Sequence, residues 1–289
     1  MIDTVRGIVS RRVHHPEAIA EAAAARVRAK SPFNSKGRTM IIAADHPARG
    51  AHAAGGDPLA MADRGELLER LYLALERPGV TGVLATADVI DDLLLLGVLD
   101  GKTVLGSMNR TGLAGSSFEI DDRFASYDAD ALARMRFDGG KMLTRICLDD
   151  PVTPTVLENT ARAVDELAGH RLIAMVEPFL SVWAGGRLRN DLSPDAVIRA
   201  ITIASGLGSS SAYTWLKLPV VDDMARVLAA STLPAVLLGG EVADADATFA
   251  AWQEALALPT VQGLVVGRAL LYPQDGDVAK AVDTAVGLL

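Results

Sequence analysis

The chain has 289 residues, half of them hydrophobic, and a formal net charge of −8. That length supports one large domain with a substantial core, so we expect a single domain over residues 1–289. The acidic balance and the lack of a dense Lys or Arg run argue against a nucleic-acid partner and against binding to an anionic membrane.

A single cysteine, Cys147, excludes an internal disulfide and a site built from several thiolates. We interpret it as a small buried hydrophobe. The N-terminal stretch has basic residues but no continuous apolar region before a cleavage site. No apolar run reaches the roughly 18 residues that span a bilayer. These observations predict a cytoplasmic protein.

Residues 1–37 precede the first expected strand. Within them, the alanine-rich stretch AIAEAAAARV at 18–27 has the pattern of an amphipathic helix. We therefore predict an N-terminal helical extension ahead of the main fold.

From residue 39 onward, short apolar runs alternate with segments of helical spacing. The expected strands span 39–47, 82–87, 102–108, 140–148, 171–179, 214–221, 234–240 and 261–271. The expected helices span 64–76, 88–97, 128–137, 154–169, 193–208, 222–231, 244–257 and 277–289.

This alternation, with strands that are apolar almost throughout, indicates parallel pairing with helices over the outer face. Eight such units in about 250 residues match the size of a closed (β/α)8 TIM barrel. An open doubly wound sheet is the alternative, but AADHPARG after the first strand lacks the G-x-G-x-x-G turn of dinucleotide-binding folds. We predict the barrel, whose sites lie at the C-terminal ends of the strands.

Polar residues and glycines stand at those strand ends. They are Asp45, His46, Ser107, Asn109, Arg110, Lys141, Arg145, Glu177, Lys217, Gly239, Gly240, Gly267 and Arg268.

Lys217 interrupts the apolar strand TWLKLPVV. A buried lysine is costly unless it is paired or neutral, and a neutral amine can attack a carbonyl carbon. A second lysine, Lys141, stands in the apolar strand GGKMLTRI and would favour the neutral amine further by like-charge repulsion. Two alternatives stay open: Lys217 extends to solvent beside a carboxylate, and Lys141 forms a structural ion pair.

Asp45 and Glu177 end the first and fifth expected strands. Carboxylates beside a reactive lysine can assist loss of water from a carbinolamine and can take a hydroxyl proton as a carbon–carbon bond breaks. Taken singly, each would more often be a salt-bridge partner, but together with two buried lysines the acid–base role is favoured.

The last two strands end in LLGG and VVGR. Glycines let backbone N–H groups approach an anion, and Arg268 adds charge and two parallel hydrogen bonds, so we expect a phosphate at this usual position. His46 would polarise a substrate oxygen or pair with a neighbouring carboxylate. The other four histidines are scattered, so we expect no metal site and no cofactor.

Taken in order, AADHP, GGKMLTRI, MVEPF, WLKLPVV, LLGG and VVGRAL resemble class I aldolases of the deoxyribose-phosphate and tagatose-bisphosphate aldolase superfamily. The resemblance covers residues 39–271. It implies that Lys217 is the Schiff-base lysine, Lys141 the accessory lysine, and Asp45 and Glu177 the acid–base carboxylates. The phosphate ligands that it implies are Gly240, Gly267 and Arg268.

Arg145 departs from that resemblance, because relatives tend to carry a tyrosine or another uncharged residue there. The group that protonates the enamine is therefore open, and Arg145 would instead suit a substrate carboxylate.

YTWLKLPVV and the loop GSMNRTGLAGSSFEIDDR are similar to a branch of actinobacterial barrel proteins encoded among inositol-degradation genes. That resemblance implies a 5-dehydro-2-deoxy-phosphogluconate aldolase, which yields dihydroxyacetone phosphate and malonate semialdehyde. Arg110 or Arg145 would bind the substrate carboxylate.

Other functions and properties stay open. The substrate alternatives are tagatose 1,6-bisphosphate, fructose 1,6-bisphosphate and a sulfo-sugar phosphate, and the non-enzymatic alternative is a barrel that binds a sugar phosphate and regulates a partner. A homo-oligomer is compatible with the sequence, and the loop at 109–128 has the composition of a lid.

Overall fold

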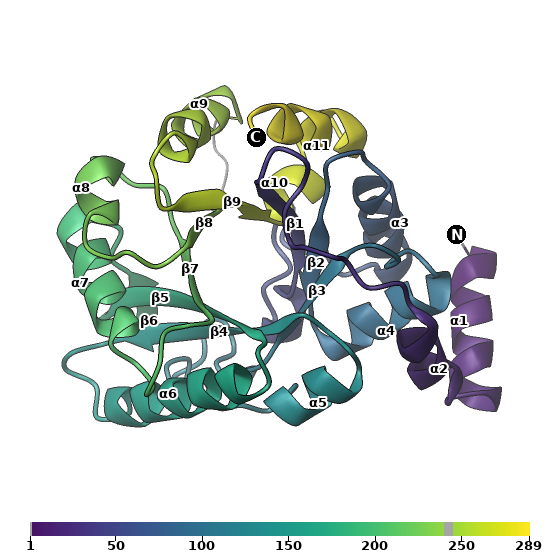
Figure 1. The fold of residues 1–289 in the computed structure, drawn as a ribbon, viewed down its shortest axis with the longest axis horizontal. Helices are drawn as coiled ribbons and strands as arrows, with labels where there is room; N and C mark the ends of the chain where they lie inside the picture. The colour runs from purple at the N-terminus through teal and green to yellow at the C-terminus, as the bar shows by residue number, and fades with distance from the viewer. Residues whose placement is uncertain (1, 240–244) are drawn as a thin grey trace.

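A computed structural model describes residues 2–239 and 245–289. In this part of the chain, parallel strands close into a barrel and helices surround it (Figure 1). The barrel strands are β1 (Thr39–Ala44), β2 (Gly82–Ala85), β3 (Thr103–Ser107), β4 (Gly139–Ile146), β5 (Ile173–Ala184), β7 (Thr214–Leu218), β8 (Ala235–Leu238) and β9 (Val261–Val266).

Around the ring the strand order is β4, β3, β2, β1, β9, β8, β7 and β5, and pairing of β5 with β4 closes it. Every barrel strand begins within two residues of the start expected from the apolar runs, while the strand ends differ by up to five residues. The predicted (β/α)8 barrel is confirmed.

The helices that follow the strands also form where helical spacing predicted them, although α5 and α8 are shorter than expected. Aspartate or serine side chains cap the backbone N–H groups at several of their N-termini, as at Asp63 and Ser193. The helices are α3 (Arg64–Leu75), α4 (Ala87–Leu96), α5 (Ala129–Arg134), α6 (Thr153–Gly169), α7 (Pro194–Ser205), α8 (Met224–Leu228), α9 (Ala245–Leu256) and α11 (Val278–Gly287).

Alternate residues of each strand face opposite sides, which divides the apolar core in two. One cluster fills the barrel interior and contains Ile41, Ala43, Leu84, Leu105, Met175, Val236 and Val265. The intervening residues, such as Ile42 and Leu216, join the larger core between strands and helices. Lys217 therefore points into the barrel, because its neighbours Leu216 and Leu218 face the helices.

Two parts of the observed fold differ from the sequence prediction. The expected strand 261–271 ends at Val266, and residues Arg268–Leu271 form the short helix α10, because Gly267 takes φ −117° and ψ −96° and breaks the strand. The fifth strand continues past residue 179 and turns back into an antiparallel strand, β6 (Arg187–Asn190).

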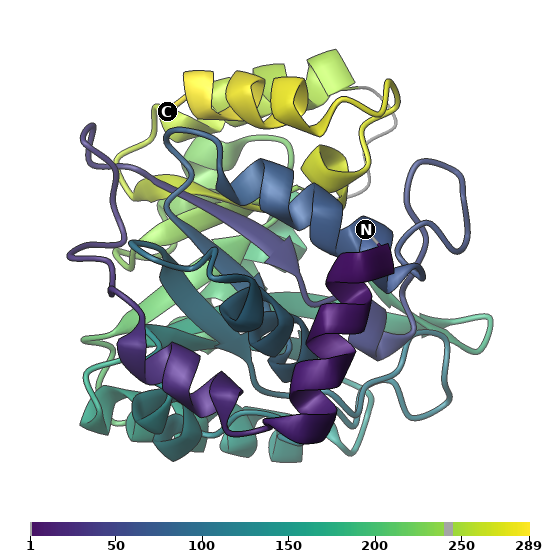
Figure 2. The same cartoon turned by 90° about the vertical axis from the view of Figure 1, so that its right-hand side faces the viewer.

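The N-terminal helices lie outside the ring. Helices α1 (Ile2–His14) and α2 (Ala18–Ala25) pack against α3 and α4, at the side seen in Figure 2. Just after α2, the buried Arg26 donates hydrogen bonds of 2.8 Å and 2.7 Å to the backbone carbonyls of Lys102 and Arg136. The extension is thus fastened beside the starts of β3 and β4.

The segment after α2 crosses the end of the barrel where the strands begin. There the ring of Phe33 stacks on that of Trp215, with centroids 5.6 Å apart. Trp215 is the second residue of β7 and packs against the interior cluster. Phe33 therefore covers the floor of the barrel, opposite the C-terminal ends of the strands.

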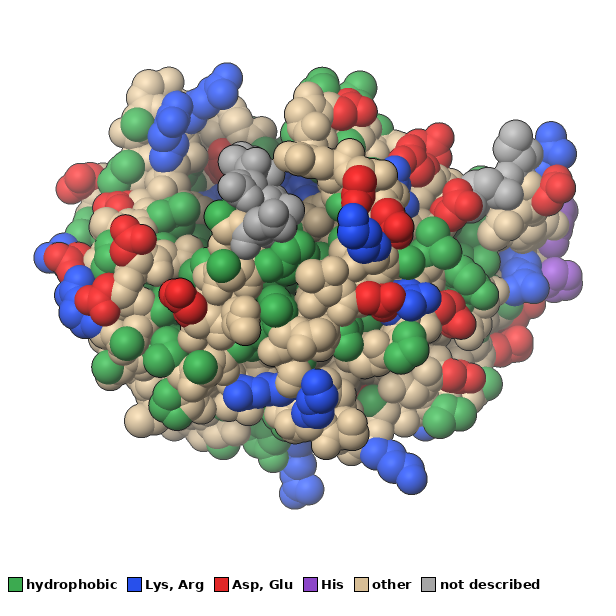
Figure 3. Space-filling view, turned by 90° about the horizontal axis from the view of Figure 1, so that it is seen from above, with side chains coloured by type: hydrophobic (Ala, Val, Ile, Leu, Met, Phe, Trp, Pro, Cys, Tyr) green, Lys and Arg blue, Asp and Glu red, His purple; other side chains and the backbone are tan. Residues whose placement is uncertain are grey.

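The outer surface is mixed in character. On the face seen in Figure 3, acidic and basic side chains are interspersed among hydrophobic ones. Among the helices that the structure describes, none is both long and apolar enough to cross a bilayer. Cys147 is buried, as its interpretation as a small hydrophobe requires.

Candidate active site

A cavity of about 730 Å³ lies at the C-terminal ends of the strands. Most of the residues proposed from the sequence face it together, although they come from strands far apart in the chain. Those residues are Asp45, His46, Lys141, Arg145, Glu177, Lys217, Gly239, Gly267 and Arg268.

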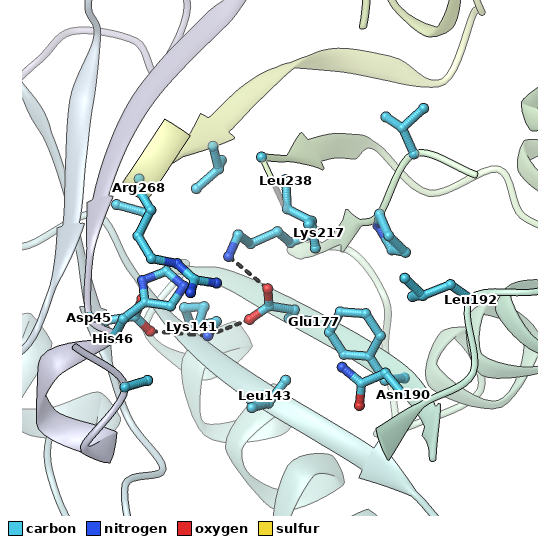
Figure 4. A pocket seen from close by; sticks show the side chains of 18 of the residues that line it. Asp45, His46, Lys141, Leu143, Glu177, Asn190, Leu192, Lys217, Leu238 and Arg268 are labelled. Atoms are coloured by element: carbon cyan, nitrogen blue, oxygen red, sulfur yellow. Dashed lines mark hydrogen bonds and ion pairs between the residues drawn. The ribbon is translucent and has the colours of Figure 1, made fainter. Parts of the chain in front are cut away.

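Lys217 lies at the centre of this cavity. Its Nζ donates a hydrogen bond of 2.7 Å to Oε1 of Glu177. The two residues come from neighbouring strands, where Val176 of β5 pairs with Leu216 of β7. The other carboxylate oxygen of Glu177 forms an ion pair with Nζ of Lys141, so both lysines point at one carboxylate (Figure 4).

Asp45 extends this set of charges. Nζ of Lys141 also donates to Oδ2 of Asp45, at 3.1 Å. Lysine and carboxylate thus alternate in the order Lys217, Glu177, Lys141 and Asp45. All four side chains belong to buried residues, where an unpaired charge would be costly, so the pairing is what allows them to be charged inside the barrel.

Both carboxylates are ionised at neutral pH. Burial alone would raise the pKa of Glu177, but Lys141 and Lys217 more than offset it and hold that pKa at about 2. Burial likewise opposes ionisation of Asp45, and the surrounding cations, Lys141 foremost, bring its pKa well below the usual range. For Lys141 burial dominates and lowers its pKa, so this lysine releases a proton more readily than an exposed one.

Arg110 donates hydrogen bonds to both the side chain and the backbone of Asp45. Its Nη1 donates to Oγ of Ser107 at 2.8 Å and to Oδ2 of Asp45 at 3.3 Å, and its Nη2 donates to the backbone carbonyl of Asp45. Ser107 donates to the same carboxylate oxygen at 3.2 Å. In the described part of the chain the cavity lining does not include Arg110, whose guanidinium contacts Asp45 and Ser107.

His46 lies between Asp45 and Arg268 (Figure 4). Its Nδ1 is 3.7 Å from Oδ1 of Asp45. Burial lowers the pKa of His46 to about 4, so the imidazole is neutral at pH 7 and is available as a hydrogen-bond partner. Arg268 is held by a 3.2 Å hydrogen bond from Nη1 to the carbonyl of Ala53.

The structure describes part of the end of the cavity where the sequence predicted a phosphate, at the ends of β8 and β9. Gly239 and Gly267 both line the cavity. A Cβ atom at Gly267 would lie 2.3 Å from the carbonyl oxygen of Ala43, and one at Gly239 would lie 2.6 Å from Cγ1 of Val266. Gly267 is therefore required by a close approach of backbone, whereas a Cβ at Gly239 would need the side chain of Val266 to move. Gly240 lies outside the described residues.

Arg49 is a site residue that the sequence reasoning missed. It ends the 3-10 helix η1 (Pro47–Arg49), lines the cavity and donates to the carbonyls of Asn109 at 2.7 Å and Gly112 at 3.0 Å. Asn109 in turn bonds both the N–H and the carbonyl of Leu143, at 2.9 Å and 2.6 Å. The start of the loop proposed as a lid is thus hydrogen-bonded to η1, just after β1, and to β4.

Two further parts of the lining were also missed. Asn190 ends the β5–β6 hairpin and Leu192 follows it, while Thr248 and Trp252 belong to α9. The hairpin did leave a signal in the sequence, the Gly-Gly pair at 185 and 186, whose φ angles of 59° and 74° suit a two-residue turn. Nothing in the pattern of α9 indicated that its side chains reach the cavity.

The described lining carries more positive than negative charge. Arg49, Lys141, Arg145, Lys217 and Arg268 face it, against the carboxylates of Asp45 and Glu177. Asp122 and Glu119 lie behind two of these arginines and form ion pairs with them. In a chain of net charge −8, this excess favours an anionic ligand. No three His, Cys, Asp or Glu side chains of the described residues gather as a metal site would need.

Comparison with solved structures places this fold among known barrels. The crystal structure of Cgl0159 from Corynebacterium glutamicum (Brevibacterium flavum) is 52% identical, with a TM-score of 0.97 over 100% of this chain and 97% of that chain. A Schiff-base-forming fructose-1,6-bisphosphate aldolase is 19% identical, with a TM-score of 0.65 over 93% of this chain and 99% of that one.

An archaeal fructose-1,6-bisphosphate aldolase, solved with its catalytic Lys covalently bound to the carbinolamine intermediate, is 18% identical. Its TM-score is 0.64 over 93% of this chain and 98% of that chain. At such identities the two aldolases show a shared fold alone.

No curated protein is similar enough to count as a match. The model of the Cgl0159-like family matches residues 37–286, which is the barrel and almost all that follows the N-terminal helices. The chain therefore belongs to the Cgl0159-like family.

Proposed function

We propose that this protein is a class I aldolase that cleaves a ketose phosphate through a Schiff base on Lys217. The observation that carries the proposal is the buried arrangement in which Glu177 receives Lys217 on one oxygen and Lys141 on the other. An amine at the centre of a cavity, with proton acceptors in contact, is what covalent capture of a carbonyl requires.

The first half of the reaction forms the iminium. Lys217 gives its proton to the network of Glu177, Lys141 and Asp45, and the free amine adds to the substrate ketone to form a carbinolamine. The network then returns a proton to the carbinolamine hydroxyl, which leaves as water. The lowered pKa of Lys141 suits it to carry this proton between the two carboxylates.

The second half breaks the carbon–carbon bond. A carboxylate, Asp45 or Glu177, removes the proton from the hydroxyl beyond the bond to be cleaved, and that hydroxyl becomes the carbonyl of the leaving aldehyde. The bonding electrons move into an enamine, with the iminium as the electron sink. Protonation of the enamine carbon and hydrolysis by water release the second product and restore Lys217.

The phosphate of the substrate belongs at the ends of β8 and β9. Gly239, Gly267 and Arg268 line the cavity there, and the neutral imidazole of His46 lies beside Arg268. Backbone N–H groups and a guanidinium are the usual phosphate ligands at this position of a barrel. Binding energy from the phosphate would align the reacting bond with Asp45 and Glu177.

The substrate that we propose is 5-dehydro-2-deoxy-phosphogluconate, which would give dihydroxyacetone phosphate and malonate semialdehyde. Its support is the resemblance of YTWLKLPVV and the 109–128 loop to barrel proteins of inositol degradation, together with the excess of cations in the described lining. The shared fold with Schiff-base-forming aldolases is compatible with the lysine chemistry.

Reductive trapping tests the proposal. Borohydride added with dihydroxyacetone phosphate should attach the ligand irreversibly to Lys217, where mass spectrometry of peptides locates it. Lys217→Met should abolish the adduct and the cleavage of the sugar phosphate, while Lys36→Met, an exposed lysine, serves as the control. Cleavage retained in Lys217→Met would refute the Schiff base on this lysine. An unmodified Lys217 in a wild type that cleaves no sugar phosphate would leave a non-catalytic sugar-phosphate-binding barrel.

The choice of substrate is tested separately, by a cleavage assay. Faster cleavage of tagatose 1,6-bisphosphate or fructose 1,6-bisphosphate would overturn the carboxylated substrate and keep the lysine chemistry.

A further inference from the structure

One wall of the cavity takes no part in the lysine chemistry described above. It consists of Leu143, Arg145, Phe179, Asn190 and Leu192, all of which line the cavity, and we call it the distal wall. Arg145 of β4 pairs in register with Phe179 of β5, and Ser181 of β5 pairs with Asn190 of β6. The distal wall is therefore a continuous surface over three neighbouring strands.

The distal wall faces the predicted phosphate end across the barrel. Strand β4 is four strands from β9 in either direction around the closed ring. In Figure 4, Arg268 and Asn190 lie on opposite sides of the Lys217–Glu177 pair. A ligand with its phosphate near Arg268 and its carbonyl carbon at Lys217 consequently directs its other end toward the distal wall.

Two polar groups on the wall are held in place by buried partners. Nη2 of Arg145 lies 2.9 Å from Oε1 of Glu119, which is itself 6% exposed. Oγ of Ser181, 1% exposed, donates at 3.0 Å to Oδ1 of Asn190. Because that bond occupies the amide oxygen, it turns the Nδ2 donor of Asn190 toward the cavity.

The rest of the wall is apolar. Leu143 and Phe179 lie between the two polar groups and Glu177, and both are buried. A hydroxyl placed against them would lose its hydrogen bonds to water without gaining a partner, whereas an unsubstituted carbon would not. The wall thus suits a ligand that has bare carbon next to the reacting centre and a polar group at its end.

The charge at the wall selects the kind of polar group. Glu119 contacts both Nη atoms of Arg145, Nη2 through its carboxylate at 2.9 Å and Nη1 through its backbone carbonyl at 3.4 Å, so the guanidinium offers the wall its remaining N–H donors and Asn190 adds a neutral donor. A guanidinium matches the two oxygens of a carboxylate, and a phosphate dianion would need further cations.

We propose that the distal wall is a carboxylate-binding subsite, in which Arg145 and Asn190 select a leaving aldehyde that carries a terminal carboxylate on an unsubstituted carbon. The proposal rests on the proposed function, because capture of the carbonyl by Lys217 sets the direction of the ligand. It assigns substrate specificity to residues outside the lysine–carboxylate network, one of them on the β5–β6 hairpin.

Direct binding tests the subsite without requiring any reaction. The probe is 3-hydroxypropanoate, titrated into the full-length protein by calorimetry, and propane-1,3-diol is the matched ligand without a carboxylate. We expect saturable binding of the acid alone, with Kd raised about tenfold in Arg145→Gln and severalfold in Asn190→Ala. Arg187→Gln, an exposed arginine on the same hairpin, should leave Kd within about twofold of the wild type.

The same Kd in Arg145→Gln as in the wild type would overturn the proposal, as would equal binding of the diol. If Arg145→Gln does not fold, Arg145→Lys and Asn190→Ala carry the test, since Lys keeps the charge but loses the two parallel hydrogen bonds. A further experiment measures the reverse reaction, in which dihydroxyacetone phosphate condenses with either malonate semialdehyde or glyceraldehyde 3-phosphate. Preference of the wild type for glyceraldehyde 3-phosphate over malonate semialdehyde would also overturn the subsite.

Reductive trapping separates this proposal from the proposed function. A wild-type protein that binds 3-hydroxypropanoate through Arg145 but gives no Lys217 adduct refutes the aldolase and retains the subsite. An adduct on Lys217 with no effect of Arg145→Gln on binding retains the aldolase and refutes the subsite.

Discussion

At the scale of single residues, Glu177 is the group on which the charge balance of the barrel interior depends. It lies between Lys141 and Lys217 and is in contact with both. Desolvation of such groups is expensive, so a buried ion network contributes little net stability compared with apolar packing. Its retention inside this barrel is better explained by chemistry than by folding.

Replacing Glu177 by Gln should destabilise the protein strongly. The change keeps the shape of the side chain but leaves two buried lysines with less compensating charge, a loss of about 3 kcal/mol or more in the free energy of unfolding. Urea denaturation at pH 7 measures it. The matched control is Glu158→Gln, whose partner Arg162 lies one turn away on an exposed helix face and whose loss should cost under about 1 kcal/mol.

The effect of Glu177→Gln should depend on pH in one direction. The pKa of Glu177 falls from an ordinary 4.5 to about 2 in the folded protein, so its ionised form is favoured by folding. That contribution is fully present above about pH 4.5 and is lost as the pH falls toward 2. The difference between wild type and variant should therefore shrink below pH 4.5. A difference that stays constant from pH 7 to pH 3 would contradict this account.

At the scale of elements, the strands and helices that could be predicted from the sequence are those that follow from a local hydrophobic pattern. Each barrel strand was visible because it is apolar on both faces, and Lys217 stood out because it breaks that pattern. The end of β9 was not visible, since residues 269–271 are as apolar as a strand and only the backbone angles at Gly267 show the break.

The parts of the site that escaped prediction depend on tertiary contacts. Arg49 reaches the cavity because the chain after β1 folds back toward Asn109. Asn190 reaches it because β5 extends beyond the barrel and the chain returns as the antiparallel strand β6. Neither event alters the hydrophobic pattern of the element concerned. By contrast, Asp45, Lys141 and Glu177 were found because the ends of parallel strands must meet at one mouth of the barrel.

Gly267→Ala should disturb the join between β9 and β1. The new Cβ would lie 2.3 Å from the carbonyl of Ala43, so the strand end must move, at a cost of about 1–3 kcal/mol in the free energy of unfolding. Because Arg268 follows directly, we also expect weaker binding of dihydroxyacetone phosphate, measured by calorimetry. Gly169→Ala, at the end of α6 with open space around it, is the control and should leave ligand binding unchanged without lowering the free energy of unfolding.

At the scale of the whole molecule, the two ends of the barrel differ in composition: one carries the candidate site and the other is an apolar, stabilising floor. Charged and polar side chains gather at the end where the strands finish, while the floor is apolar and is covered by Phe33 against Trp215. This division matches the general rule that residues at the N-terminal face of such barrels serve stability. The N-terminal extension therefore belongs to the stabilising half of the molecule.

Phe33→Ala should lower stability and leave the site intact. The substitution removes a partly buried ring that stacks on Trp215, a loss of about 1–2 kcal/mol in the free energy of unfolding. The cavity lies at the far end of the strands, so the yield of the Lys217 adduct and the KM for the cleaved sugar phosphate should stay at wild-type values. Tyr72→Ala, an aromatic residue 47% exposed on α3, should change neither stability nor KM. A raised KM in Phe33→Ala would show instead that the floor and the mouth of the barrel are coupled.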